Sequence, residues 1–382
     1  MRILFWSGNF WPQIGGAEVL AAKLLPALRE RGYEFVVVTL QQSPDQPAED
    51  RYKGIPIYRF PLRGNYSSID QLTAGVLKVK QQVIKLKHTF APDLIHLSAV
   101  DIGSFFHVIT ADAHPTPLLV TLHNVLPGQA VGHTSWLGRL IRAADWITCV
   151  SAAVLAETRQ LVPEITPRSS VIYNGLDAPS LPPEPLPLEI PRLLCLGRLA
   201  REKGFDLALN ALASIIDRFP HARLVIAGDG PERPQLERQI AELGLTDVVD
   251  LIGWVAPAEV PALINITTMV LMPSWWEGLP SVALQAALMA RPVVATRVGG
   301  LPEAVVHQQT GLLVEPEDCV GLAEAIAFLL EHPAVTVQMG QAARRLVHDV
   351  FGWQRCVDAY DALYRELAKK VIRCSSQRRE DR

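Results

Sequence analysis

The sequence predicts an α/β protein built from two doubly wound domains. Short apolar runs alternate with amphipathic stretches along nearly the whole chain, as expected for strands followed by helices. Several runs are continuous Val, Ile and Leu, which is typical of parallel strands that crossover helices cover on both faces. A proline-rich segment divides the alternation into two series. Because such folds bind ligands beyond the carboxyl ends of their strands, we expect a ligand in the cleft between the domains.

The first series of expected strands occupies the N-terminal half of the chain. Amphipathic stretches such as Ala17–Arg31 and Gln71–Lys87 lie between several of these strands and are expected to be helices. The expected strands are Arg2–Trp6, Phe35–Leu40, Ile55–Phe60, Leu94–Leu97, Leu118–Leu122, Ile147–Val150 and Val171–Tyr173.

The proline-rich segment begins near Asp177 and contains five prolines up to Pro187. Such a density of proline cannot continue a helix or a central strand. We therefore expect an N-terminal domain at 1–178, a linker at 179–190 and a C-terminal domain at 191–352. The second series of expected strands is Leu193–Leu196, Leu224–Ala227, Val249–Ile252, Val270–Met272, Val293–Ala295 and Leu312–Val314.

The C-terminal stretch Trp353–Val371 is expected to be one amphipathic helix, because its large apolar side chains recur at helical spacing. We expect this helix, at about 353–372, to pack back on the N-terminal domain, and the polar residues Cys374–Arg382 to be frayed. The apolar positions are Val357, Tyr360, Leu363, Tyr364 and Leu367.

Composition excludes several classes of protein. The chain has 382 residues, of which 49% are hydrophobic and 20% charged, and a formal net charge of −3. This charge offers no general attraction for nucleic acid. The five cysteines form no CxxC pair, so neither a zinc site nor a disulfide framework is indicated. No stretch approaches the roughly 20 apolar residues of a membrane span, and we expect a cytoplasmic protein.

The segment from Pro273 to Ala286 is the strongest indication of chemistry. It follows an expected strand, and Pro280 is suited to the first turn of a helix. Glu277 would then lie in the loop at the start of that helix, and Gln285 about one and a half turns inside it. The free N–H groups at a helix start suit a diphosphate, which also makes Gly278, Leu279 and Pro280 candidates for binding it. A surface Glu and an ordinary helical Gln are the alternative interpretation.

Two basic residues, Arg198 and Lys203, follow the expected strand Leu193–Leu196. An Arg fork and a Lys point charge could bind the same diphosphate. Solvated residues at the start of a helix are the alternative interpretation. Gly15 and Gly16 follow the first strand and open a helix, where glycine permits close approach of a phosphate or sugar. An ordinary tight turn is the alternative, and no GxGxxG dinucleotide motif is present.

The whole chain resembles the retaining family 4 glycosyltransferases, which have the GT-B fold: two Rossmann-like doubly wound domains facing across a cleft. Several motifs carry the resemblance and occur in the family's order, which makes it far more specific than one motif. They are residues 273–286, Arg291–Thr296, Gly299–Glu303, Gly311–Val314, Gly197–Gly204, Ala227–Pro231, Gly15–Glu18, Thr121–His123 and Asn174–Asp177.

The resemblance implies roles for the catalytic candidates. Arg198 and Lys203 would stabilise the leaving diphosphate, and Glu277 would orient hydroxyls of the transferred sugar. His123 would face that sugar, donating to a hydroxyl or stabilising the sugar cation, although a lone histidine is often structural. Such enzymes lack an obvious enzymic nucleophile and are thought to react on one face of the sugar. The leaving phosphate would accept the acceptor's proton.

Gln285 departs from the family, which usually has a second Glu at this position that hydrogen-bonds the donor ribose. A neutral amide oxygen accepts a weaker hydrogen bond than a carboxylate. We therefore expect weakened donor binding rather than lost chemistry. A protein that binds nucleotide sugars without turnover is the alternative that Gln285 leaves open.

Three further residues are donor-binding candidates with structural alternatives. Glu303 would contact the donor or cap a helix. Trp254 would flank the nucleotide base or lie in the core. Asn174 would contact the nucleotide or hold the turn before the linker.

A cluster of lysines suggests a contact with lipid. Lys78, Lys80, Lys85 and Lys87 alternate with apolar residues in one expected helix. A basic amphipathic helix can lie on an anionic membrane, here the inner face. Most such helices simply solvate one face.

The expected function is transfer of a sugar from a nucleotide diphosphate donor to an unidentified acceptor, which could be a polysaccharide, a lipid-linked glycan or a small molecule. Uridine is the commonest base among the family. A GT-B sugar-nucleotide epimerase is the alternative enzyme, but the first domain lacks a convincing set of acid and base carboxylates. No cofactor is expected, because the nucleotide sugar is a substrate. No metal is expected either, since the chain has no Asp-x-Asp motif. Specificity would depend on variable loops such as Arg63–Ser68 and Leu126–Trp136.

Overall fold

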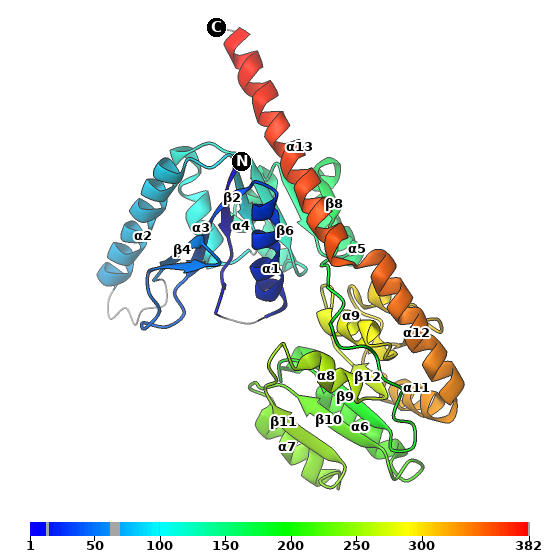
Figure 1. Ribbon diagram of the computed structural model, residues 1–382. Coiled ribbons are helices and arrows are strands. Elements are labelled where there is room, and N and C mark those ends of the chain that lie inside the picture. The colour runs from blue at the N-terminus through cyan, green and yellow to red at the C-terminus, as the bar shows by residue number, and fades with distance from the viewer. Residues whose placement is uncertain (13–14, 62–68, 99, 381–382) are drawn as a thin grey trace. The chain divides into compact units, whose positions relative to one another are not determined.

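The computed structural model describes residues 1–12, 15–61, 69–98 and 100–380. The chain forms two compact units (Figure 1): unit 1 is Met1–Tyr173 with Cys356–Arg382, and unit 2 is Asn174–Arg355. The division falls at Asn174, so residues 174–178 lie in unit 2 rather than in the N-terminal domain to which we assigned them. Each unit contains one sheet.

Unit 1 contains an 8-stranded sheet in the order β3-β4-β2-β1-β5-β6-β7-β8. All its strand pairs are parallel except β3 with β4. The order runs outward in opposite directions from β1, so the topological switch point lies between β1 and β5. The strands are β1 (Arg2–Trp6), β2 (Glu34–Leu40), β3 (Glu49–Tyr52), β4 (Ile55–Phe60), β5 (Leu94–Leu97), β6 (Leu118–Leu122), β7 (Trp146–Cys149) and β8 (Ser169–Val171).

Two strands of this sheet differ from the prediction. β3 was not predicted, because its sequence Glu49–Tyr52 contains no apolar run. It is an antiparallel edge strand whose side chains are exposed or half-buried. β8 is Ser169–Val171 instead of Val171–Tyr173, and it therefore begins with two serines. Polar side chains suit an edge strand, which hydropathy alone detects poorly.

The helices of unit 1 begin after strands of the sheet, as in other doubly wound folds. Ser151 caps α5 by accepting a hydrogen bond from Val154 N at 3.2 Å, and Ser135 caps α4 in the same way. The helices are α1 (Gly16–Glu30), α2 (Ile69–Phe90), α3 (Ile102–Val108), α4 (Trp136–Ala143) and α5 (Ala152–Leu161).

Unit 2 contains a 6-stranded, wholly parallel sheet in the order β11-β10-β9-β12-β13-β14. Numbered from its first strand this order is 3-2-1-4-5-6, the order of dinucleotide-binding folds. Its switch point therefore lies between β9 and β12. The strands are β9 (Arg192–Leu196), β10 (Arg223–Ala227), β11 (Val249–Gly253), β12 (Met269–Met272), β13 (Val293–Thr296) and β14 (Gly311–Val314).

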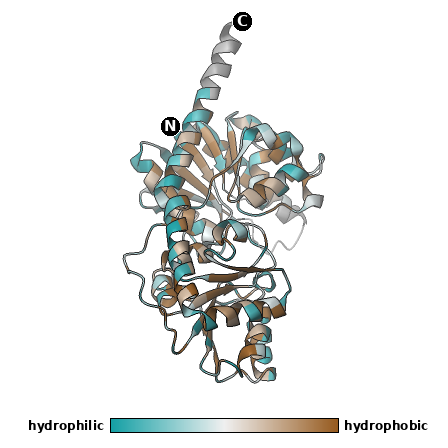
Figure 2. Cartoon of the chain, turned by 90° about the vertical axis from the view of Figure 1, so that its right-hand side faces the viewer, coloured by the Kyte–Doolittle hydropathy of each residue, from teal (hydrophilic) through white to brown (hydrophobic). Residues whose placement is uncertain are grey.

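The strands of unit 2 lie in its hydrophobic core, as the continuous apolar runs predict. Leu193, Leu224 and Met269 are fully buried among side chains of the crossover helices. The strands of both sheets are correspondingly hydrophobic in Figure 2. The helices are α6 (Phe205–Ile215), α7 (Arg233–Glu242), α8 (Val260–Asn265), α9 (Ser281–Leu288), α10 (Leu301–Ala304), α11 (Cys319–Glu331) and α12 (Pro333–Val350).

The proline-rich segment predicted to be a linker is bound to unit 2 along its length. Asn265 Oδ1 accepts from Glu184 N at 2.9 Å, and Thr268 Oγ1 donates to Pro187 O at 2.8 Å. The buried Arg291 donates through Nη1 to Glu184 O at 2.9 Å. Proline has no backbone N–H to donate. Side chains of the rest of unit 2 therefore bind the segment chiefly at the segment's own carbonyl oxygens.

Helix α13 (Trp353–Glu380) packs on the sheet of unit 1 through its buried residues between Cys356 and Leu367. It continues to Glu380, so the predictions of a helix end near 372 and of fraying at 374–380 were wrong, while residues 381–382 lie outside the described part of the chain. Arg31 Nη2 forms an ion pair with Asp358 at 2.6 Å, and Tyr33 Oη donates to Asp361 Oδ1 at 2.6 Å. These polar contacts surround buried aromatic side chains of α13.

A buried hydrogen-bond chain joins α13 to the strands. His96 Nδ1 lies 2.6 Å from Tyr364 Oη, and His96 Nε2 lies 2.7 Å from Thr121 Oγ1. Thr121 Oγ1 also lies 2.7 Å from Thr148 Oγ1. Burial lowers the pKa of His96 to about 3, so the ring is neutral at pH 7 and each nitrogen needs its own partner.

Among the described residues, no single helix has both the length and the apolar composition to cross a membrane. The bent pair of α11 and α12 meets those two criteria jointly, with an angle of 103° between the helices.

The buried hydrogen-bond chain predicts the effect of Tyr364→Phe. Removing the hydroxyl leaves His96 Nδ1 buried without a partner, so the free energy of unfolding should fall by about 1–3 kcal/mol. Urea denaturation measures this change. Tyr58→Phe is the control, because Tyr58 is half-buried. Equal stability of Tyr364→Phe and the parent protein would contradict the assignment.

Candidate active site

Two loops meet at the switch point of unit 2. The loop after β9 is joined to the loop after β12 by Trp275 N, which donates to Glu202 O at 2.9 Å. Gly204 closes the first loop in the left-handed region, with φ 62°. A Cβ on Gly204 would lie 2.1 Å from Pro273 O, so a side chain there would separate the loops. Because β9 and β12 are parallel neighbours, their carboxyl ends bring these loops to one place.

Lys203 and Glu277, predicted from separate motifs, are in contact. Lys203 Nζ donates to Glu277 Oε1 at 2.6 Å, and Ser274 Oγ donates to the same oxygen at 2.9 Å. The Glu277 side chain is 9% exposed and that of Lys203 is 25% exposed. Among the described residues, no donor reaches the second oxygen, Oε2. That oxygen can therefore accept a hydrogen bond from a ligand.

The backbone of Glu277 is held by the two glycines that precede α10. Gly300 N donates to Glu277 O at 3.1 Å. Gly299 has φ 48°, and a Cβ there would lie 1.8 Å from the same carbonyl oxygen. The motif Gly299–Gly300 thus has a physical reason, since only glycine lets the chain turn this closely around Glu277.

Arg198 does not share the carboxylate of Glu277 with Lys203. Its guanidinium forms an ion pair with Glu202 instead, and the Arg198 side chain is 70% exposed. Desolvation alone would raise the pKa of Glu202, but a backbone hydrogen bond and the hydrogen bond from Arg198 together hold it below its ordinary value. The described structure thus joins only one of the two predicted cations to Glu277.

The start of α9 offers backbone donors beside Glu277. Gly278, Leu279 and Pro280 are all buried. Pro280 is the N-cap residue, and α9 begins at Ser281 without a side-chain capping bond, so the predicted proline lies one residue earlier than the first turn. The amides of the first turn are available to an anion. Gln285 is half-buried on the same helix.

The remaining donor-binding candidates of unit 2 lie in different settings. Trp254 follows β11 and is 61% exposed, which excludes the core interpretation. Asn174 is the first residue of unit 2, and its Oδ1 is buried without a hydrogen-bond partner among the described residues. Glu303 lies in the first turn of α10, near the end that favours a carboxylate.

The candidates in unit 1 lie at the carboxyl edge of its sheet. His123 follows β6, and its Nε2 lies 3.3 Å from Ser98 Oγ after β5. Burial lowers the pKa of His123 to about 4, so the ring is neutral at pH 7 and can donate a hydrogen bond. Gly15 is the N-cap of α1 and adopts an extended conformation, and Gly16 begins the helix.

Three polar residues that contact candidate residues within their own unit were not singled out from the sequence: Ser274 and Glu202 in unit 2, and Ser98 in unit 1. Ser274 and Glu202 lie inside motifs that resemble the family, but a serine or a glutamate is too common in loops to indicate a functional role by its type alone. Ser98 lies in no motif. The described residues contain no group of three or more His, Cys, Asp or Glu that could hold a metal ion.

Comparison with known families assigns both halves of the chain. A model described as Glycosyltransferase Family 4 matches residues 14–180, and one described as Glycosyl transferases group 1 matches residues 181–346. The chain belongs to glycosyltransferase family 4.

Known relatives of this glycosyltransferase match nearly the whole chain. A glycogen synthase of Mycobacterium tuberculosis is 28% identical over 95% of this chain and 94% of its own. A D-inositol 3-phosphate glycosyltransferase of Pseudarthrobacter chlorophenolicus is also 28% identical, over 89% of this chain and 88% of its own.

Solved structures show that the glycosyltransferase has the GT-B fold, as predicted. Sucrose-phosphate synthase from Thermosynechococcus elongatus superposes with a TM-score of 0.82 at 23% identity, covering 96% of this chain and 98% of its own. Anabaena HepE, solved in complex with UDP and glucose, has a TM-score of 0.78 at 24% identity, covering 95% and 99%.

The predicted membrane contact of the enzyme is not supported. Lys87 is fully buried, and its Nζ donates to Thr110 O at 2.8 Å. Its inclusion in a lipid-binding face was therefore wrong. The periodicity of α2 places Lys87 beside its apolar face, where Val83 and Phe90 are buried. Lys78 and Lys85 are exposed and Lys80 is half-buried. The loop Arg63–Ser68, predicted to contribute to specificity, lies outside the described residues.

The contact of Gly299 with Glu277 predicts a large effect of Gly299→Ala. A left-handed conformation costs an alanine about 1–2 kcal/mol, and the overlap with Glu277 O adds to this cost. Gly244→Ala is the control, because Gly244 has φ 68° and open space around its Cα. In urea denaturation, Gly299→Ala should lose more stability than Gly244→Ala. Equal losses of stability would mean that the backbone of Gly299 does not lie tightly against Glu277 O.

Proposed function

We propose that this enzyme is a retaining glycosyltransferase that transfers a sugar from a nucleotide diphosphate donor, with a UDP-sugar favoured, to a carbohydrate or lipid-linked acceptor. The observation that carries the proposal is the contact of Lys203 with Glu277 at the switch point of unit 2. A cation for a diphosphate, a carboxylate for a sugar and the open amides of α9 gather there.

The diphosphate gains negative charge as its bond to the sugar breaks. The Lys203 ammonium and the first-turn amides of α9 offer fixed positive charge for it. Arg198 would add a guanidinium fork after exchanging its ion pair with Glu202 for the diphosphate. Both partners of that pair are partly exposed, so the exchange costs little.

Glu277 orients the sugar in this proposal. Lys203 and Ser274 hold one of its carboxylate oxygens, which leaves Oε2 for a sugar hydroxyl. Hydrolases of the paired-carboxylate type need two carboxyl groups flanking the bond that breaks. The residue eight positions after Glu277 is Gln285, which is neutral and cannot serve as the second.

The reaction proceeds on one face of the sugar. The bond between the anomeric carbon and the diphosphate oxygen breaks, and the acceptor oxygen bonds that carbon from the same side. The acceptor's proton passes to the departing phosphate oxygen. The neutral ring of His123 is suited to donate a hydrogen bond to a sugar hydroxyl. We assign no cofactor or metal to these steps, because cationic side chains supply the positive charge.

The relatives support the donor class and leave the acceptor open. HepE, of similar fold, was solved with UDP, with UDP-glucose, and with UDP and glucose. The named activities of the relatives include glycogen synthesis and inositol phosphate glycosylation, so their acceptors differ in size and charge.

A donor screen followed by a transfer assay tests the proposal. A nucleotide sugar that raises the thermal midpoint identifies the donor, because a ligand stabilises the state that it binds. The protein is then incubated with that radiolabelled donor and candidate acceptors. Labelled acceptor with its anomeric configuration retained supports the proposal. An isomerised donor would indicate an epimerase, and tight binding without product would indicate a binding protein.

Lys203→Ala should reduce kcat by about a hundred- to a thousandfold, because the leaving diphosphate loses a preorganised charge. Arg201→Ala is the control. It removes the same charge from the same loop, where Arg201 lies over the Trp275 ring at 5.6 Å. Steady-state kinetics with the identified donor measure both variants. Near-normal kcat in a folded Lys203→Ala protein would refute the role of Lys203.

Gln285→Glu should tighten the binding of UDP about tenfold, since a carboxylate makes the stronger hydrogen bond to the ribose hydroxyls. Isothermal titration with UDP measures the affinity without the sugar. Gln235→Glu on α7 adds the same charge at an exposed position and is the control. Unchanged or weaker binding by Gln285→Glu would show that this side chain does not contact the ribose.

A further inference from the structure

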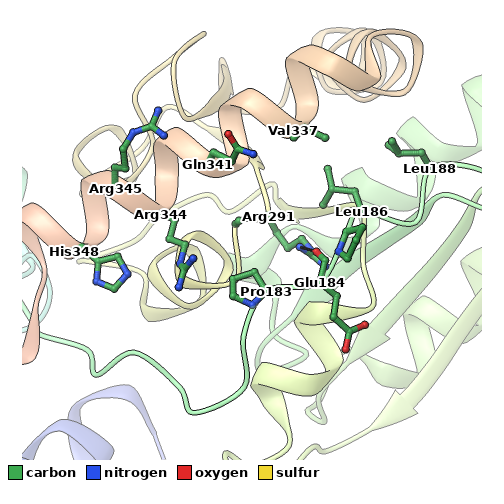
Figure 3. A pocket seen from close by; sticks show the side chains of 12 residues that line it. Pro183, Glu184, Leu186, Leu188, Arg291, Val337, Gln341, Arg344, Arg345 and His348 are labelled. Carbon is green, nitrogen blue, oxygen red and sulfur yellow. Dashed lines mark hydrogen bonds between the residues drawn. The ribbon is translucent and has the colours of Figure 1, made fainter.

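Unit 2 contains a cavity that shares no lining residue with the site at Lys203 and Glu277. Its volume is about 900 Å³. One wall is the proline-rich segment from Pro183 to Leu188, the floor is Ala290 and Arg291 after α9, and the other wall is α12. Figure 3 shows these walls and the side chains between them.

One face of α12 supplies the cationic part of the lining. Val337, Gln341, Arg344, Arg345 and His348 recur every three or four residues, so they lie on one side of the helix. Arg344 and His348 extend toward Pro183, whereas Arg345 points away from it (Figure 3). Within the described part of the chain, neither arginine forms an ion pair with a carboxylate. Their charges are therefore available to a ligand.

Arg291 adds a buried positive charge at the floor. The residue is 1% exposed, and its Nη atoms donate only to neutral oxygens, among them Glu184 O at 2.9 Å and Met289 O at 2.8 Å. Its Nε is buried without a partner among the described residues. Burial lowers the pKa of Arg291 to about 10, and Glu184 only partly opposes this effect. The C-terminal end of α9 compensates a fraction of the charge.

The charge of this cavity is opposite to that of the whole protein. Its lining holds three arginines against the single carboxylate of Glu184, while the whole chain carries −3. The Glu184 carboxylate points away from α12 in Figure 3, so it does not neutralise Arg344. A cavity with unpaired guanidinium groups attracts anions, and phosphate suits the fork of an arginine best.

Much of the remaining lining is apolar, and it indicates what chemical group the ligand carries besides its phosphate. Leu186, Leu188 and Val337 line the part of the cavity that lies away from Arg344 (Figure 3), and Pro183 and Pro185 add further apolar surface. An inorganic phosphate would leave most of the volume unfilled. A phosphate ester with an apolar or planar body would bury these side chains as well.

We propose that this cavity binds an organic phosphate, with the phosphate on Arg344 and His348 and the body against the prolines and Leu186. The ligand would touch Arg291, which holds both the proline-rich segment and the end of α9. The site is independent of the proposed donor site, and its test does not require turnover.

Isothermal titration of the full-length protein with 1-naphthyl phosphate, glucose 6-phosphate and inorganic phosphate tests this site. We expect saturable binding of 1-naphthyl phosphate with a Kd below about 1 mM, and at least tenfold weaker binding of inorganic phosphate. Glucose 6-phosphate between the two would show that the apolar walls select the body. Tighter binding of glucose 6-phosphate than of 1-naphthyl phosphate would overturn the apolar part of the assignment.

Matched variants locate the binding. Arg344→Ala should weaken 1-naphthyl phosphate at least tenfold, and His348→Ala should weaken it to a lesser degree. Arg238→Ala removes an exposed arginine from α7 and should bind normally. Lys203→Ala should also bind normally. Loss of binding in Lys203→Ala with retention in Arg344→Ala would place the ligand at the donor site and overturn the proposal. Absence of saturable binding in the parent protein would overturn it as well.

Discussion

The parallel pairing of β9 with β12 is the constraint on which the candidate active site depends. These strands are neighbours in the sheet although β10 and β11 lie between them in the sequence. Their carboxyl ends therefore bring together two loops that no local interaction would join. The Trp275–Glu202 backbone bond and the glycine at 204 then hold the loops close enough for Lys203 to reach Glu277.

Within that frame, the chain pairs its cations with its own carboxylates. Lys203 is bonded to Glu277, and Arg198 is bonded to Glu202. Each pair lowers the cost of gathering like charges at one place before a diphosphate arrives. The two pairs differ in exposure, since Glu277 is nearly buried and Glu202 is not. The first pair is thus a fixed part of the site, and the second is the one that an incoming anion can exchange.

Much of the fold could be predicted because its strands are buried on both faces. Leu193–Leu196 and Val293–Ala295 are continuous apolar runs, and burial is the physical cause of that pattern. β3 could not be predicted, because an exposed edge strand such as Glu49–Tyr52 has no reason to be apolar. The helical spacing of Tyr360 and Tyr364 predicted α13, but nothing in the polar residues after Cys374 marked where it ends.

The sequence identified residues of the candidate site, but it did not show which of them contact one another. Motifs identified Lys203 and Glu277, which lie 74 positions apart, but their bond depends on the strand order. Arg198 was expected to act with them, but its side chain pairs with Glu202. No sequence pattern shows which carboxylate a long side chain will contact. The attachment of the proline-rich segment was likewise hidden, since it depends on Arg291, Asn265 and Thr268, far along the chain.

The discontinuity of unit 1 has a consequence for how the protein is made. Residues Met1–Tyr173 leave the ribosome well before Cys356–Arg382, so His96 and Thr121 are synthesised long before Tyr364 and Tyr360. Unit 2 is continuous and can complete its core while the earlier sheet still lacks its final helix. The unit whose synthesis begins first is therefore the last to complete its core, because that core waits for α13.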